Sequence, residues 1–182
     1  MNHVLLVIII AISILLFLLL LALVLPKQYS VTVSETIHRP KKVVYDYVSL
    51  FKHQRDYSEW IKADPDLRPT VKGTDGTVGA VMSWESQQTD RKKNIGSGEQ
   101  EIKRMDEDRI EVELRLIMPM PATCQLVHEF EAKGENATRY TCTFSTYAKF
   151  PVNLPAYLLG RKFIARTQQK TLRNIKEILE RS

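Results

Sequence analysis

The sequence predicts an α+β domain in which an antiparallel sheet packs against one long C-terminal helix, preceded by a separate transmembrane helix. Three observations lead to this prediction. Residues 4–25 carry no charged side chain, residues 67–150 largely alternate between apolar and polar side chains, and residues 153–181 carry an apolar stripe at helical spacing. A sheet with one apolar face and an amphipathic helix can both bury that apolar surface by packing on each other.

The N-terminal segment is long enough to cross a bilayer. Only Ser13 interrupts an apolar run from Val4 to Leu25, and a membrane core requires roughly 20 helical residues. A cleaved signal peptide is the alternative, but its apolar part normally spans about 7–15 residues between a basic start and a small-residue cleavage site. The segment lacks both flanks. Residues 1–27 are therefore predicted to form a membrane anchor, and residues 28–182 a single domain.

Charge predicts the orientation of the anchor. No Lys or Arg precedes the apolar run, whereas Lys27, Arg39, Lys41 and Lys42 follow it, so the domain is expected on the cytoplasmic side. The net charge of +5 suits a domain held at an anionic membrane surface, and anionic lipid headgroups are expected partners. Nucleic acid is not expected, because the basic residues lack interleaved exposed aromatics or a recognised binding module.

The domain begins with a strand and short helices. Residues 29–37 alternate as in a strand, and Pro40 suits the start of a helix. Apolar residues recur at helical spacing from Val43 to Phe51, which predicts one short helix and then a second that ends near Trp60. Residues 62–69 hold two prolines and two aspartates and are predicted to form a loop.

Six further strands are expected from about residue 67 onward. In residues 76–86 one face carries Val78, Ala80, Met82 and Trp84. A strand over residues 94–104 holds Gly96 and Gly98, where missing side chains leave empty volume or permit a bulge. The strand over residues 109–118 places Ile110, Val112, Leu114, Leu116 and Met118 on one face. The hairpin of residues 122–150 places Cys124, Leu126, His128 and Phe130 opposite Tyr140, Cys142 and Phe144.

The final segment, residues 153–181, is predicted to be one long helix. Pro155 lies near its first turn, and its apolar stripe is formed by Leu154, Leu158, Ala165, Leu172, Ile175 and Leu179. This stripe is the surface that the helix would present to the sheet.

Four stretches carry a resemblance to a known family: "VSETIHRPKKVVYDYVSLFKHQRDYSEW", "VGAVMSWES", "IGSGEQEI" and "RIEVELRLIMPM". They resemble the bacterial polyketide cyclase/dehydrase and lipid-transport branch of the START-like (SRPBCC) superfamily, over residues 28–182. The resemblance implies the helix-grip fold, a curved seven-stranded antiparallel sheet wrapped around the C-terminal helix, with two short helices after the first strand. It also implies a cavity that in relatives holds sterols, lipids, polyketides or plant hormones, and a bacterial protein whose anchor lies in the inner membrane.

The expected ligand-binding residues lie on the concave face of this sheet or at the end of the short helices. They are Trp60, Ala80, Met82, Trp84, Gln100, Val112, Leu114, Leu116, Leu126, His128, Phe130 and Tyr140. For each of them, simple filling of the core is the alternative. Gln100, His128 and Tyr140 would supply the few polar groups of an otherwise apolar pocket.

His128 and Tyr140 are also the candidate catalytic residues. General acid–base catalysis requires a titratable group that is usually oriented by a partner, and no Asp or Glu shares the face of His128 on its own strand. A buried, hydrogen-bonded pair is the alternative. No cofactor and no metal are expected, because no cluster of His, Cys, Asp and Glu has ligand spacing, and Cys124 and Cys142 are expected to be buried thiols.

Three functions stay open. The preferred one is a membrane-anchored binding or carrier protein for a small hydrophobic ligand, lipid or polyketide-like. Its cavity would measure several hundred Å³, roughly the usual range, with a mouth near the short helices or the start of the long helix. The second is a cyclase- or dehydrase-like enzyme that uses His128 and Tyr140. The third is a non-catalytic interaction module with a filled core.

Overall fold

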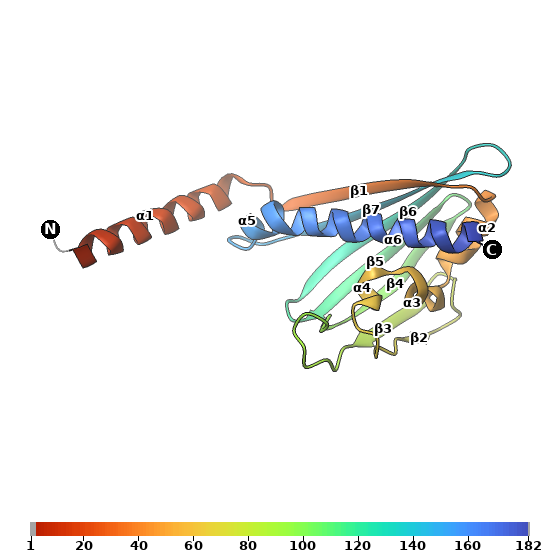
Figure 1. The fold of residues 1–182 in the computed structure, drawn as a ribbon, viewed down its shortest axis with the longest axis horizontal. Coiled ribbons are helices and arrows are strands. Elements are labelled where there is room, and N and C mark those ends of the chain that lie inside the picture. Colours follow the sequence, from red (N-terminus) through yellow and green to blue (C-terminus); the bar gives the residue numbers. More distant parts are fainter. Residues whose placement is uncertain (1–2, 182) are drawn as a thin grey trace.

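A computed structural model describes residues 3–181 and shows a seven-stranded antiparallel sheet that curves around a long C-terminal helix, with a separate N-terminal helix (Figure 1). The predicted helix-grip architecture is therefore confirmed. The predicted anchor begins with Met1 and Asn2, and the predicted domain ends with Ser182. These three residues lie outside the described residues.

Helix α1, His3–Val24, consists almost entirely of apolar residues. It is long and apolar enough to cross a membrane. Most of its side chains are exposed, whereas Ala22 is buried and Leu19 and Leu21 are half-buried. The helix extends away from the domain (Figure 1).

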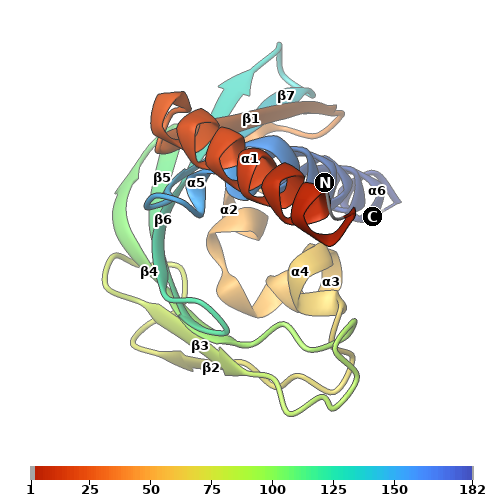
Figure 2. The same ribbon diagram turned by 90° about the vertical axis from the view of Figure 1, so that its left-hand side faces the viewer.

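Strand β1, Gln28–Ile37, leads into helix α2, Lys41–Ser49. The predicted second helix is three short turns instead: a 3₁₀ turn over Phe51–His53, α3 over Gln54–Tyr57 and α4 over Glu59–Lys62. Extended backbone at Leu50 and Ser58 separates these pieces. The chain is thereby broken into segments that follow the inside of the curved sheet (Figure 2).

The other strands are β2 (Thr70–Lys72), β3 (Val81–Glu85), β4 (Ser97–Asp106), β5 (Arg109–Met118), β6 (Ala122–Ala132) and β7 (Thr138–Tyr147). The sheet order is β1-β7-β6-β5-β4-β3-β2, all antiparallel. The predicted faces of the last hairpin are confirmed, because Leu126 pairs with Phe144 and Phe130 pairs with Tyr140.

Three predictions about the strands are wrong at their ends. The strand expected over residues 94–104 begins only at Ser97, and Gly96 lies before it with a positive φ angle. The strand expected over residues 76–86 begins only at Val81, because Gly76 and Gly79 adopt positive φ angles and form a turn. Val78 therefore lies outside the apolar face and is 58% exposed. Met118, at the end of β5, is also exposed rather than buried with the apolar row before it.

The C-terminal segment consists of a short α5 (Asn153–Pro155), a π-helical turn (Ala156–Gly160) and α6 (Arg161–Arg181). Leu172, Ile175 and Leu179 are buried against the sheet, as predicted. Leu158 is exposed, because it lies in the π-helical turn, whose wider winding changes the phase of the stripe.

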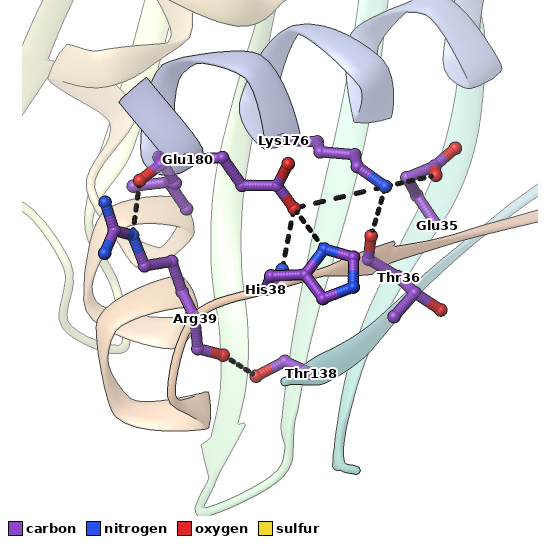
Figure 3. A network of polar contacts seen from close by, with 8 residues as sticks. Glu35, Thr36, His38, Arg39, Thr138, Lys176 and Glu180 are labelled. Atoms are coloured by element: carbon purple, nitrogen blue, oxygen red, sulfur yellow. Dashed lines mark hydrogen bonds and ion pairs between the residues drawn. The ribbon is translucent and has the colours of Figure 1, made fainter. Parts of the chain in front are cut away.

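A polar network fixes the C-terminal end of α6 to the end of β1 (Figure 3). Glu180 Oε1 accepts a hydrogen bond from the His38 backbone N–H at 2.7 Å and contacts His38 Nδ1 at 2.9 Å. Lys176 Nζ donates to the Thr36 carbonyl at 2.7 Å. The His38 backbone N–H is the main reason why the pKa of Glu180 is lowered. This end of the helix is closed onto the sheet, and the cavity lies toward the N-terminal half of the helix.

Candidate functional site

A cavity with about 130 Å³ of free volume lies between the concave face of the sheet, the short helices α3 and α4, and the N-terminal half of α6. This volume is smaller than the several hundred Å³ expected from the sequence. The lining is formed by Gln54, Tyr57, Ser58, Trp60, Ile61, Trp84, Gln100, Leu114, Leu116, Leu126, His128, Tyr140, Phe144, Ile164, Thr167, Gln168 and Thr171.

Eight residues expected to bind ligand line this cavity: Trp60, Trp84, Gln100, Leu114, Leu116, Leu126, His128 and Tyr140. The other four, Ala80, Met82, Val112 and Phe130, are buried in the core and do not line it. Phe130 does not reach the cavity because two rings cover it. It stacks on Tyr140 with centroids 5.1 Å apart and packs edge to face with Tyr45. Such residues share the concave face with the lining but are covered by other side chains.

Apart from Trp60, the lining residues that come from the helices were not predicted from the sequence. Gln54, Tyr57, Ser58 and Ile61 reach the cavity from the short turns, and Ile164 from α6. Thr167, Gln168 and Thr171 of α6 also line it. A signal for these last three exists in the sequence, since they are polar residues between Ala165 and Leu172 of the apolar stripe. Polar side chains on the buried face of an amphipathic helix indicate a place where the core is not closed.

Trp84 owes its position to Gly98, its partner on β4. A Cβ atom at Gly98 would lie 2.7 Å from both the Trp84 ring and the Arg115 carbonyl oxygen. The β4–β5 register also shifts between Ser97 and Gly98, where a bulge is one of the two expected effects of glycine. The glycine does not leave empty volume, because the indole occupies it and presents its ring to the cavity.

Four of the polar side chains that line the cavity form two separate pairs. His128 Nδ1 and the Tyr140 hydroxyl are 2.7 Å apart. Gln100 Nε2 donates to Gln54 Oε1 at 2.6 Å. Burial lowers the pKa of His128 to about 4 and raises the pKa of Tyr140 well above its usual value. Both rings are therefore neutral at pH 7.

The lining as a whole carries no charge at neutral pH, because no Asp, Glu, Lys or Arg belongs to it in the part of the chain that the structure describes. Between His3 and Arg181 no group of three His, Cys, Asp or Glu side chains is arranged to hold a metal ion. An apolar cavity with a few hydrogen-bonding groups suits a neutral molecule that is mostly apolar.

One side of the cavity ends at two aromatic rings. Trp60 of α4 meets Phe163 of α6 edge to face, with centroids 6.4 Å apart, and Phe163 is 56% exposed. The neighbouring lining residues Leu116 and Ile164 are half-buried. The wall of the cavity at the N-terminal half of α6 is thus formed by partly exposed side chains.

The family model described as polyketide cyclase / dehydrase and lipid transport matches residues 28–180. No curated protein sequence matches the chain. Among solved structures, norcoclaurine synthase from Thalictrum flavum, determined with dopamine and hydroxybenzaldehyde, has a TM-score of 0.64 at 8% identity and covers 85% of this chain and 87% of its own. A protein from Thermus thermophilus has a TM-score of 0.59 at 17% identity, with coverage of 85% and 99%. Ara h 8.0201 has a TM-score of 0.60 at 11% identity, again with coverage of 85% and 99%.

Proposed function

Because the chain belongs to the polyketide cyclase / dehydrase and lipid transport family, we propose that it binds a small hydrophobic ligand between the sheet and α6 while α1 holds it in a membrane. The observation that carries this proposal is the uncharged cavity, apolar along Leu114, Leu116 and Leu126 and polar at His128 and Tyr140. Ligand sites typically combine an apolar wall with a few such placed polar groups.

The size of the cavity limits the ligand. A dry apolar cavity of about 150 Å³ accepts a molecule the size of benzene, whereas sites for larger ligands measure roughly 300–1,000 Å³. With about 130 Å³, the cavity accepts one ring-sized group. A lipid or polyketide-like ligand would therefore enter with its apolar end, and a larger part would require Trp60 and Phe163 to separate.

An enzyme of the cyclase or dehydrase type is the second candidate, and the contact between His128 and Tyr140 is the observation that favours it. A general base works best when its pKa is near the working pH, and burial lowers the pKa of His128 to about 4. No carboxylate among the described lining residues orients the imidazole. The pair is thus better suited to hydrogen-bonding a polar group of the ligand than to moving its proton.

The anchor sets the location that we propose. Lys27 and three basic residues between 39 and 42 follow α1, which favours a cytoplasmic domain on a bacterial inner membrane. In that position the cavity lies beside a reservoir of hydrophobic molecules. The third possibility, an interaction module with a filled core, is the weakest because the core retains free volume.

Native mass spectrometry tests the proposal on residues 28–182, purified without the anchor. We expect a discrete lipophilic adduct that is lost in Leu116→Arg, which places a charge in the lining. Val78→Arg is the matched control, because it introduces the same side chain at an exposed position outside the cavity. An apo mass in the wild type, unchanged after exposure to membrane lipid extract, would contradict ligand binding.

A further inference from the structure

The sheet brings several connections to the end of the domain from which α1 departs. Gln28, the first residue of β1, pairs with Tyr147, the last residue of β7. The start of β6 pairs with the ends of β5 and β7, and Ser97 of β4 pairs with both Met118 and Glu85. The loops 86–96, 119–121 and 148–152 therefore share this end with α5 (Figure 1). We call it the anchored end.

Exposed apolar side chains gather at the anchored end. They form an apolar rim of Ile117, Met118, Met120, Tyr147, Phe150, Val152, Leu158, Leu159 and Phe163. Among the described residues outside α1, only Val43, Val71 and Val78 are large apolar side chains that are exposed elsewhere. Contiguous exposed apolar surface marks a contact with a protein or a membrane.

Asn153 holds the anchor against this rim. Its side chain is 1% exposed, and its Nδ2 donates to the carbonyls of Ala22 at 2.7 Å and Leu25 at 3.2 Å. The last carbonyls of a helix have no partner within the helix, so the Asn153 amide caps the C-terminal end of α1. Figure 2 looks onto the anchored end, with α1 lying in front of it. A bilayer that contains α1 must therefore lie close to the rim.

The charges at the anchored end complement an anionic bilayer. Lys27, Lys149, Arg161 and Lys162 are exposed, and none of them pairs with a carboxylate in the part of the chain that is described. Residues 91–93 of the neighbouring loop add three more basic side chains and directly follow the acidic Asp90. Basic residues at the surface of a membrane attract anionic headgroups, and a soluble protein partner would not explain why they surround the anchor.

We propose that the anchored end is a bilayer-contact surface, in which the apolar rim enters the acyl boundary and the four basic residues without a carboxylate partner lie among anionic headgroups. This inference rests on the membrane anchor of the proposed function and adds a second contact to it. It also deepens that function, because the rim residue Phe163 contacts the lining residue Trp60 edge to face. This wall of the cavity, at Trp60 and Phe163, then faces the lipid, and ligand reaches the cavity from the bilayer rather than from water.

Spin labels on the full chain in nanodiscs test the contact. The nanodiscs contain equal parts of palmitoyl-oleoyl phosphatidylcholine and phosphatidylglycerol, and labels are placed by Met120→Cys and Leu159→Cys. These residues are 62% and 71% exposed, so their replacement removes little packing. Cys124 and Cys142 do not compete, because both thiols are buried and burial raises the pKa of each.

We expect labels at 120 and 159 to collide more with oxygen, which dissolves in lipid, than with a water-soluble nickel complex. Asn136→Cys, in the β6–β7 turn at the opposite end, is the control and should show the reverse. Ser13→Cys, in the middle of α1, reports on the anchor itself. If the label at 13 is exposed to lipid but the labels at 120 and 159 are exposed to water, the bilayer-contact surface is refuted while the membrane anchor of the proposed function stands.

Water exposure at 13 would instead overturn the membrane anchor of the proposed function, together with this inference. Nanodiscs of phosphatidylcholine alone test the headgroup part of the proposal. The label at 159 lies close to Arg161 and Lys162, and its lipid exposure should fall in these nanodiscs. Equal exposure in both lipids would refute the role of the basic residues.

Discussion

Replacing His128 by glutamine should remove part of the pH dependence of the domain's stability. Burial lowers the pKa of His128 from 6.5 to about 4, so the folded domain keeps the imidazole neutral where the unfolded chain protonates it. The depressed pKa means that the stability is fully present above about pH 6.5 and is lost as the pH falls toward 4. The difference between the two pKa values corresponds to at most about 3 kcal/mol of unfolding free energy.

Urea unfolding of residues 28–182 at several pH values between about 4 and 8 measures this effect, for the wild type and for His128→Gln. Other groups that titrate, such as Glu180, contribute to both proteins and cancel in the difference. Tyr140→Phe is the control, because it removes the hydrogen bond and lowers stability by about 1 kcal/mol but leaves a buried imidazole. Parallel pH profiles for the wild type and His128→Gln would refute a neutral, buried histidine in this cavity.

Gly98→Ala should lower the unfolding free energy by about 1–3 kcal/mol, because its Cβ would overlap the Trp84 ring; an unchanged melting temperature would contradict this packing. Glu180→Gln should cost about 1–2 kcal/mol at pH 7 through its weakened hydrogen bonds to His38. The pKa of Glu180 is lowered, so this cost should disappear as the pH falls below the usual carboxyl range, and an equal cost in urea midpoints at pH 7 and pH 3 would refute it. Burial raises the pKa of Cys142 to about 12, so a thiol reagent at pH 8 should modify it only after unfolding; rapid reaction of the folded domain would contradict its burial.

Alternation of side chains predicted the sheet well where no glycine interrupts it. Strand β5 spans Arg109–Met118, the same range as its apolar alternation. Strand β3 does not follow its pattern, because the positive φ angles of Gly76 and Gly79 end the extended backbone before Val81. A period-two pattern gives the face of each side chain but does not show where a glycine turns the chain.

The sequence predicted which strand residues lie on the concave face, but not which of them border free space. Trp84 and Phe130 both face the concave side, but the first rests on Gly98 and borders free space while the second is covered by Tyr140. Which of the two outcomes occurs depends on contacts between residues far apart in the sequence. The volume is harder still to predict, because one ring such as Trp84 occupies as much space as the whole cavity offers to a ligand.

Titration of residues 28–182 with benzene, followed by ¹H–¹⁵N and methyl NMR, tests the central claim most directly. The sequence holds two tryptophans, so Trp84→Phe assigns their indole signals. We predict saturable shifts of the Trp84 indole and of the Leu116 and Leu126 methyls, with little change at exposed Val78. Signals from these lining groups that do not move at saturating benzene would show that the cavity does not accept an apolar ligand, and would contradict the proposed function.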